Sequence, residues 1–349
     1  MACDIIVTVY DNVELTKRCL ESVLKNFRQQ DTVLLVDNGS AEATGVFLRQ
    51  FCRQHQGKDI QIIRLSPNQG YIRAANAGLG RSRKEFACLL SNDTVVTAGW
   101  LDEIESLFAG HRDIGIIGPS SNTYGLHPGK GMGPEEFSRS LVKDAGTFVD
   151  VASCVGFCMA VRREVIQRIG VLDEAFGHGY FEDTDYCRRA QAAGFRCVIS
   201  KASYVWHREH STFADDTRKK LFEKNKRLFE ERWGAPKRFA CILEAAAFAR
   251  NDFGPAIGLY LSLARKGHWL WVVADPGVPR DVLDSLRQHG NIRTIVVGKQ
   301  LVALRAILLV LAKQKKKIDA VYICPGMSRL KKTLLRVLCA RPLQELTYD

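Results

Sequence analysis

Three carboxylates stand within four residues in the segment Phe181-Glu182-Asp183-Thr184-Asp185. Carboxylates this close repel one another unless a cation, hydrogen bonds or a bound substrate balances them, and the crowding raises a pKa. A raised pKa suits a group that takes a proton from a substrate hydroxyl, so Asp183 is a candidate general base. The structural alternative is a helix N-terminus, where the acidic side chains complement the helix dipole and Arg188 or Arg189 pairs with them.

Polar clusters also follow four apolar, strand-like runs in the first hundred residues. They are Thr8-Val9-Tyr10-Asp11, Asp37-Asn38-Gly39-Ser40, the stretch from Asn68-Gln69-Gly70-Tyr71 through Arg73 to Asn76, and Ser91-Asn92-Asp93-Thr94. Ligands of open α/β sheets bind at the carboxyl ends of the strands, so we expect these clusters to surround one site. Each cluster alone has a structural alternative, because Asp37-Asn38-Gly39 is a common turn and Asn92-Asp93 can cap a helix.

Histidine and cysteine residues could also bind a metal. His207 and His210 stand three residues apart in Trp206-His207-Arg208-Glu209-His210, although a single surface histidine is commoner than a ligand pair. Cys154 and Cys158 are the most closely spaced cysteines, which is weak support for zinc. The eleven cysteines show no framework spacing and predict reduced thiols and a cytoplasmic protein.

Alternating strand-like and helix-like segments must position these side chains. We expect strands at Ile5–Val9, Thr32–Val36, Ile60–Leu65 and Phe86–Leu90, and helices at Glu14–Phe27, Glu42–His55 and Asn76–Arg83. Residues 119–147 are rich in Gly, Pro and Ser and predict a long surface loop. Helices are expected again at Arg163–Ile169, Asp183–Ala193 and Thr217–Trp233, with a strand at Cys197–Ile199. The order predicts an α/β fold with a mostly parallel central sheet covered on both faces.

A domain boundary is expected after residue 234, where Gly234 and Pro236 follow a charged helix. We assign residues 1–234 to the first domain and residues 235–268 to a helical linker, with helices at Lys237–Arg250 and Pro255–Arg265. Residues 269–349 form three predicted βα units of a small Rossmann-like domain. Its strands are expected at Trp269–Ala274, Arg293–Val297 and Ala320–Cys324, and its helices at Pro279–His289, Gln300–Lys313 and Ser328–Leu338.

Composition and charge are those of a globular protein, with 46% hydrophobic and 25% charged residues. No run approaches the roughly 18 apolar residues of a membrane span, and the N-terminus predicts no signal peptide. The net charge is +12, and residues 235–349 hold 19 Lys and Arg against 8 Asp and Glu. That surplus could meet anionic lipid, nucleic acid or a phosphorylated acceptor, or be a solvated basic face.

Taken in order, these segments resemble the family-2 glycosyltransferases with a GT-A fold, notably the branch that contains bacterial rhamnosyltransferases. The resemblance covers roughly residues 4–234. It rests on the first strand, the Asp37 turn, the Asn68-Gln69-Gly70-Tyr71 loop through Asn76, Asn92-Asp93, Gly156 and Met159 before Arg162-Arg163-Glu164-Val165, Gly170-Val171-Leu172-Asp173-Glu174, Glu182-Asp183-Thr184-Asp185, and His207. The three C-terminal βα units also look like the first half of a nucleotide-sugar-binding domain of the other large glycosyltransferase architecture.

The resemblance implies a role for each matching residue. Thr8, Tyr10 and Asp37 would hold the base and ribose of a nucleotide sugar. Gly70, Arg73, Asn76 and Asn92 would border the same donor pocket. Asp93 would bind a divalent Mg²⁺ or Mn²⁺ ion on the diphosphate, and His207 would complete that metal site. Asp183 would take the proton of the acceptor hydroxyl, with Gly156, Glu182 and Asp185 on the acceptor side.

The implied activity is inverting transfer of a hexosyl or deoxyhexosyl group, in polysaccharide biosynthesis, from a UDP- or dTDP-sugar to a glycan, lipid-linked or protein acceptor. The basic C-terminal region would contact a partner protein or the inner face of a membrane, and nucleic acid is not expected as a partner. Two departures stand out: Ser91 where many relatives carry an acidic residue or Asn, and Ala75 where some carry an arginine, which Arg73 would replace. The alternative function is an inactive saccharide- or nucleotide-binding protein with the same core.

Overall fold

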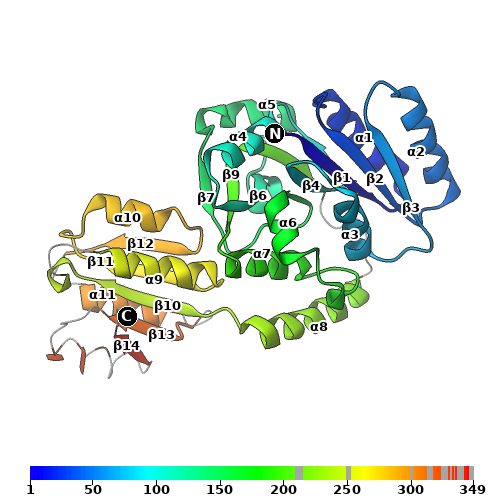
Figure 1. Ribbon diagram of the computed structural model, residues 1–349. Coiled ribbons are helices and arrows are strands. Elements are labelled where there is room, and N and C mark those ends of the chain that lie inside the picture. Colours follow the sequence, from blue (N-terminus) through cyan, green and yellow to red (C-terminus); the bar gives the residue numbers. More distant parts are fainter. Residues whose placement is uncertain are drawn as a thin grey trace. The chain divides into compact units, whose positions relative to one another are not determined.

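The structure, a computed structural model, describes residues 1–208, 215–248, 253–298, 302–312, 317–323 and 342–345, together with 329, 330, 332, 333 and 335. The chain forms two compact units, drawn in Figure 1. The N-terminal unit comprises Met1–Val149 and Ser153–Gly234, and the C-terminal unit comprises Asp150–Ala152 and Ala235–Asp349.

The N-terminal unit is built on one large sheet. Its strands are β1 (Cys3–Val9), β2 (Thr32–Asn38), β3 (Ile60–Leu65), β4 (Phe86–Ser91), β5 (Thr94–Val96), β6 (Ile114–Ser120), β7 (Phe148–Asp150), β8 (Cys158–Arg162) and β9 (Arg196–His207). Their spatial order is β3-β2-β1-β4-β8-β6-β9-β5, with β7 beside β9. Strands β3, β2, β1 and β4 run parallel, as do β6 and β9, while β8 is antiparallel to both of its neighbours. The predicted mostly parallel sheet is therefore confirmed.

Helices cover both faces of this sheet in Figure 1. They are α1 (Val13–Lys25), α2 (Glu42–Gln54), α3 (Tyr71–Arg81), α4 (Trp100–Gly110), α5 (Pro134–Leu141), α6 (Arg163–Ile169), α7 (Glu182–Ala192) and α8 (Asp215–Trp233). Three short 3-10 helices lie at Asn122–Tyr124, Val142–Asp144 and Glu174–Phe176. Every residue of β1 and β2 is buried, which explains why these strands are continuous apolar runs rather than alternating ones.

Helix α3 begins five residues earlier than the sequence predicts. Gly70 precedes it with φ of 84°, and the helix then packs so closely on β1 that a Cβ on Gly78 would lie 2.2 Å from Ile6 Cγ2. A left-handed residue at the helix start and a glycine at the contact are both needed for this approach. Arg73, expected in the loop before the helix, therefore lies on the helix itself.

Two other segments of the N-terminal unit differ from the prediction. The stretch 119–147 is not a continuous loop, because it contains α5, which begins with Pro134 at its first position and carries Glu135 and Glu136 in its first turn. Strand β9 runs from Arg196 to His207, far beyond the predicted Cys197–Ile199. The register of its pairing with β6 shifts between Gly118 and Ser120. Such an irregularity interrupts the alternation of buried and exposed side chains by which a strand is predicted from sequence.

The C-terminal unit contains a second sheet, in which all five strands are parallel. They are β10 (Arg238–Leu243), β11 (Trp269–Ala274), β12 (Ile292–Val296), β13 (Ala320–Ile323) and β14 (Leu343–Glu345), in the order β12-β11-β10-β13-β14. The helices are α9 (Gly254–Arg265), α10 (Arg280–Arg287) and α11 (Val302–Ala312), with a 3-10 turn at Ala245–Ala247. The predicted helix at Ser328–Leu338 lies largely outside the described residues.

The predicted helix at Lys237–Arg250 is wrong, because β10 occupies its first half at the centre of the second sheet. Phe239 and Cys241 belong to one hydrophobic cluster and Ala240 and Ile242 to another, so alternate side chains pack on opposite faces. A short apolar run buried on both sides has no strand period, which is why the sequence alone favoured a helix. Residues 235–268 are thus not a helical linker but contain a strand of the C-terminal unit.

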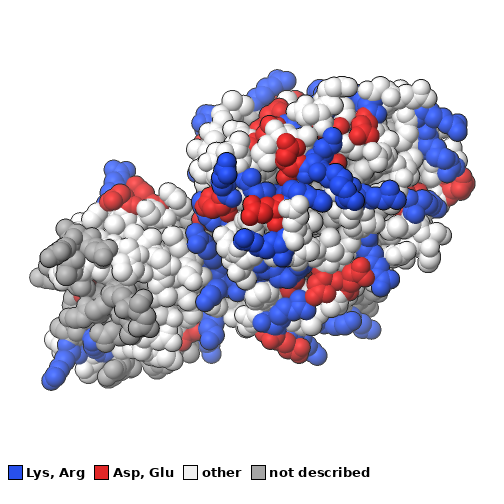
Figure 2. All heavy atoms as spheres, viewed as in Figure 1, with Lys and Arg blue, Asp and Glu red and all other residues white. Residues whose placement is uncertain are grey.

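Charge and hydropathy of the described residues bear on the expected membrane contact. No helix in the described part of the chain has both the length and the hydropathy needed to cross a membrane. Acidic and basic side chains are interspersed over the N-terminal unit on the face drawn in Figure 2. Much of the C-terminal basic surplus, including Lys313, Lys315 and Lys316, lies outside the described residues.

Candidate active site

A cavity of about 550 Å³ opens in the N-terminal unit at the carboxyl ends of the central strands. The ends of β1, β2 and β4 contribute Thr8, Tyr10, Asn38, Ser91, Asn92 and Asp93. Helices α3, α7 and α8, with the segments that precede α3 and α7, contribute Gly70, Tyr71, His178, Tyr180, Glu182, Asp183, Arg218 and Phe222. The clusters that the sequence placed at strand ends therefore meet in one cavity, together with Gly156 and His207.

Asp183 lies in the first turn of α7 with its carboxylate held by three donors. Its Oδ2 accepts a hydrogen bond from the backbone N–H of Gly156 at 2.9 Å. Its Oδ1 accepts from the backbone N–H and the hydroxyl of Thr184 at 2.6 and 3.1 Å. Burial raises the pKa of Asp183 above its ordinary value, while these hydrogen bonds favour the charged form. The group is an oriented, partly desolvated carboxylate.

The Gly156 peptide links Asp183 to α3. The Tyr71 hydroxyl donates to the carbonyl oxygen of Gly156 at 2.8 Å. The backbone N–H of the same residue donates to Asp183. A Cβ on Gly156 would lie 3.3 Å from the Tyr71 hydroxyl and 3.6 Å from the Asp183 carboxylate. Gly156 is therefore a positioning residue for Asp183, and its small size leaves room in the cavity.

Asp93 and His207 face each other at the cavity wall. His207 Nε2 lies 3.5 Å from Asp93 Oδ1, and the other ring nitrogen, Nδ1, lies 3.1 Å from the Thr123 hydroxyl. The imidazole stacks on the Phe157 ring, with centroids 4.7 Å apart and planes 9° from parallel. Antiparallel pairing of β5 with β9 sets His207 opposite Thr94, the residue after Asp93. Stacking on Phe157 and the hydrogen bond with Thr123 together fix the orientation of the imidazole ring.

These two side chains suit a divalent cation. A carboxylate oxygen and an imidazole nitrogen facing one cavity fit Mn²⁺, and the carboxylate also fits Mg²⁺. Across the part of the chain that the structure describes, no group of three or more His, Cys, Asp or Glu is arranged to hold a metal. His210 lies outside the described residues.

Comparison with protein families identifies the domain that carries this cavity. The model of the family described as "Glycosyl transferase family 2" matches residues 4–170. Residues 4–170 belong to glycosyl transferase family 2. Asp93, Gly70 and Gly156 lie within the match, whereas Asp183 and His207 lie beyond it. The predicted family is confirmed, and the rhamnosyltransferase branch stays a prediction.

Solved structures share the fold of this family-2 domain. A mannosyltransferase from Pyrobaculum calidifontis, solved with GDP-Man and Mn²⁺, aligns with a TM-score of 0.53 and 14% identity over 97% of this chain and 79% of its own. GalNAc-T7, solved with UDP, GalNAc and Mn²⁺, aligns with a TM-score of 0.50 and 16% identity over 59% of this chain and 44% of its own. The GT-A-like glycosyltransferase fold is thereby confirmed.

Curated relatives are more similar in sequence. The glycosyltransferase AglE of Haloferax volcanii is 26% identical over 201 residues, which are 56% of this chain and 63% of that protein. The uncharacterized protein y4gI of Sinorhizobium fredii is 25% identical over 279 residues, or 71% of this chain and 29% of that protein. This chain therefore spans less than two thirds of the length of either relative.

Four of the predicted site residues do not line the cavity. Asp37 is buried, accepts a hydrogen bond from the Ser40 N–H and pairs with Arg64, so it shapes the turn after β2. Arg73 is exposed and pairs with Glu174 at 3.0 Å. Asn76 exchanges two hydrogen bonds of 2.9 Å with the backbone of Leu172. Asp185, the fourth, lies in a separate buried cluster.

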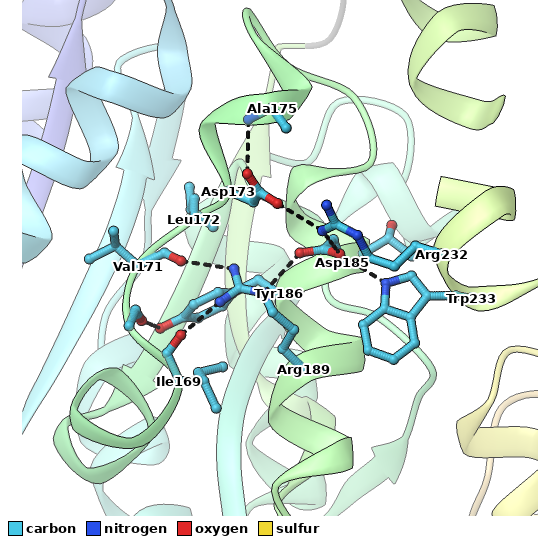
Figure 3. Close-up of polar contacts among 12 residues, drawn as sticks. Ile169, Val171, Leu172, Asp173, Ala175, Asp185, Tyr186, Arg189, Arg232 and Trp233 are labelled. Atoms are coloured by element: carbon cyan, nitrogen blue, oxygen red, sulfur yellow. Dashed lines mark hydrogen bonds and ion pairs between the residues drawn. The ribbon is translucent and has the colours of Figure 1, made fainter. Parts of the chain in front are cut away.

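The Asp185 cluster joins α7 to α8, as Figure 3 shows. Asp185 is fully buried and accepts from Arg189 at 2.9 Å, from Arg232 at 2.8 Å and from the indole N–H of Trp233 at 2.9 Å. Arg232 also pairs with Asp173 at 2.8 Å. This geometry is structural, and the predicted place of Asp185 on the acceptor side is wrong because its carboxylate faces these partners and not the cavity.

Replacement of Asp185 by Asn should destabilise the protein by about 3 kcal/mol, because Arg189 and Arg232 both lose a fully buried carboxylate and only Arg232 keeps a second one, Asp173. Chemical denaturation at pH 7 measures the loss. Glu42→Gln is the matched control, since it removes a surface carboxylate that pairs with Arg49 and should cost less than about 1 kcal/mol. Equal effects of the two substitutions would contradict the structural role of Asp185.

Several cavity residues were not predicted from the sequence. Asn68 and Tyr71 belong to the Asn68-Gln69-Gly70-Tyr71 motif, so their side chains could have been predicted to line the cavity together with Gly70. His178 lies against Gly70, where a Cβ would come within 2.7 Å of its Nδ1. Arg218 and Phe222 come from α8, whose charged sequence carries no signal that it lines a site.

A strained turn presents this part of the cavity wall. Tyr180 and Phe181 have φ of 69° and 70°, a left-handed conformation that non-glycine residues rarely adopt. The fully buried Asn225 of α8 holds the turn, because its amide donates to the carbonyl oxygens of Phe176, Gly179 and Tyr180 at 2.6, 2.7 and 3.2 Å. Tyr180 and Phe181 then contact Phe222 of the same helix, with ring centroids 5.7 and 5.3 Å away.

Proposed function

We propose that this chain transfers a sugar from a nucleoside-diphosphate sugar to a hydroxyl group of an acceptor. One observation carries the proposal: Asp93 and Asp183, from two distant parts of the sequence, line the same cavity of a family-2 glycosyltransferase domain. Two carboxylates at one site can divide the work, one beside the leaving diphosphate and the other beside the attacking hydroxyl.

Asp183 acts as the general base in this proposal. Its carboxylate takes the proton of the acceptor hydroxyl as the hydroxyl oxygen bonds to the anomeric carbon. The bond from that carbon to the diphosphate breaks, and the nucleoside diphosphate leaves with the electron pair. The hydrogen bonds from Gly156 and Thr184 keep the carboxylate oriented, so it is placed before the substrate arrives. Direct attack from the opposite face inverts the anomeric configuration.

Asp93 and His207 hold a divalent cation in this proposal. Such an ion supplies positive charge next to the departing diphosphate. Thr123 and Phe157 fix the imidazole, so its Nε2 remains directed toward Asp93. The two structural neighbours were both solved with Mn²⁺, which makes Mn²⁺ the first ion to test and Mg²⁺ the second.

Donor and acceptor use different walls of the cavity. Thr8, Tyr10 and Asn92 lie at the ends of the paired strands β1 and β4, close to Asp93. We propose that they bind the nucleotide of the donor. Tyr180 and Phe222 offer aromatic rings next to the α7 carboxylates, and such rings suit the apolar faces of a sugar. We therefore favour a saccharide acceptor over a lipid headgroup or a peptide.

The decisive experiment is a donor screen. Purified protein with Mn²⁺ is incubated with UDP-, dTDP- and GDP-linked sugars, and the release of free nucleoside diphosphate is measured with and without added glycans. GDP is included because the two neighbours were solved with different nucleotides. One donor should be consumed faster when an acceptor is present. Nucleotide binding without consumption of any donor would favour the alternative, an inactive binding protein.

The expected contact of the C-terminal region with a membrane or partner protein stays a prediction, as does a cytoplasmic location. Pelleting of the chain with vesicles of anionic lipid, compared with vesicles of neutral lipid, tests the membrane contact. Binding to anionic vesicles that is abolished by 0.5 M salt, a concentration at which the screening length is only about 4 Å, would support it.

A further inference from the structure

Glu182 is a second buried carboxyl group in the cavity, and the mechanism above leaves it without a role. It is the first residue of α7, lines the cavity next to Asp183, and is only 6% exposed. Its Oε2 has no hydrogen-bond partner among the described residues. A buried polar atom in this state needs an explanation, because such atoms are nearly always hydrogen-bonded.

The two neighbouring carboxyl groups have unequal surroundings. Asp183 accepts hydrogen bonds from two backbone N–H groups and a hydroxyl, all of which favour its charged form. Burial, and then the charge of Asp183, raise the pKa of Glu182 from 4.5 to about 8. Two carboxyls in one desolvated site cannot both ionise readily, so the negative charge resides on Asp183 and the proton on Glu182.

The other groups that face Glu182 do not reverse this assignment. Tyr71 of α3 and Tyr180 of the preceding turn are neutral at pH 7, because burial raises the pKa of both phenols. His178 lines the same cavity. Arg218 of α8 acts on Tyr180, whose pKa it lowers against the effect of burial.

We propose that Glu182 is a carboxylic acid at neutral pH and donates a hydrogen bond from its side chain to an oxygen of the bound sugar, leaving the charge of the pair on Asp183. The role in sugar binding rests on the proposed function, whereas the protonation of Glu182 does not. The neutral acid has two effects. It donates a hydrogen bond to a sugar oxygen, and it avoids a second negative charge beside Asp183.

Protonation is tested by stability, without any substrate. Between about pH 4.5 and pH 8 the folded chain holds a proton on Glu182 that the unfolded chain has lost, so the stability contributed by this site falls as pH rises through that window. Glu182→Gln removes this dependence. The Tm of the variant minus that of the wild type should therefore increase steadily from pH 5 to pH 8.

The control for this measurement is Glu21→Gln, which changes an exposed glutamate on α1. Its Tm difference from the wild type should not vary over the same pH range. A constant difference for Glu182→Gln as well would overturn the proposal, because it would mean that Glu182 is already ionised at pH 5. Glu182→Ala gives the same comparison if the amide variant does not fold.

The role in substrate binding is tested by donor consumption with Mn²⁺ and an acceptor glycan. The wild-type rate should fall above about pH 8 as Glu182 ionises, and Glu182→Gln should lack this alkaline decline. At pH 7 the amide should retain activity within a few-fold, whereas Glu182→Leu should lose about 10-fold or more, since it cannot donate. Equal losses in both variants would overturn the hydrogen-bond role. If no donor is consumed at all, the proposed function fails while the stability test still decides the proton.

Discussion

Asp183→Asn should lower the rate of sugar transfer by about 10²–10⁴-fold, because a positioned base contributes that much to proton transfer. The amide keeps the size of the side chain and can still accept a hydrogen bond from Gly156, so the fold and the donor pocket should persist. Steady-state kinetics gives the loss in kcat, and calorimetry with the nucleoside diphosphate and Mn²⁺ checks that binding is retained. Transfer at near wild-type rate in the asparagine variant would exclude Asp183 as the base.

The same carboxylate sets the acid side of the pH profile. Burial raises the pKa of Asp183 above its ordinary value, so the carboxylate gains a proton at a higher pH than a solvent-exposed aspartate. Activity should therefore decrease as pH falls, beginning above the range typical of an ordinary aspartate. Together with the alkaline decline expected from Glu182, this gives a bell-shaped profile whose two limbs belong to the pair of adjacent carboxyl groups.

Asp93→Ala should abolish the dependence of nucleotide binding on Mn²⁺ and reduce transfer by at least about 10²-fold, since the charge beside the leaving diphosphate is lost. Calorimetric titration of the nucleoside diphosphate with and without Mn²⁺ gives a readout that does not need turnover. Exhaustive chelation of the wild-type protein should have the same effect, reversed by added Mn²⁺ or Mg²⁺.

His207→Ala provides the graded comparison for the metal site. Its side chain contributes one nitrogen 3.5 Å from the Asp93 carboxylate, so its loss should weaken Mn²⁺ binding while Asp93 remains to bind the ion. The ring also stacks on Phe157, so the folded state of the variant is checked by its Tm. Full turnover after complete chelation would remove both Asp93 and His207 from the metal role.

The central sheet could be predicted from the sequence because its strands are apolar runs separated by amphipathic helices. Strands β1 to β4 and helices α1 and α2 lie within a few residues of their expected bounds. The prediction failed where local signals compete: β10 lies in an apolar stretch followed by Ala245-Ala246-Ala247, which favours helix by propensity. Its pairing with β11 and β13 decides its conformation, and neither partner is adjacent in sequence.

The sequence could predict those cavity residues that lie at the ends of strands. Thr8, Asn92 and Asp93 line the cavity because parallel strands place their carboxyl ends together. Gly156 precedes β8, which is antiparallel to β4 and therefore begins at the same edge of the sheet. Asp185 could have been separated from Asp183 by sequence, because two residues along the expected helix turn a side chain by roughly 200° and so to the opposite face. Phe222 and Arg218 depend on how α8 packs, which no local pattern encodes.

Helix α8 is fastened at two points, by Asn225 to the turn before α7 and by Arg232 and Trp233 to Asp185. A protein that ends between residues 208 and 224 would retain every strand of the first sheet yet lack Asn225, whose hydrogen bonds hold the turn at Tyr180 and Phe181. A minimal version for expression or crystallisation should therefore extend through Trp233, and a version ending near residue 208 should fold into a sheet with an unfinished pocket.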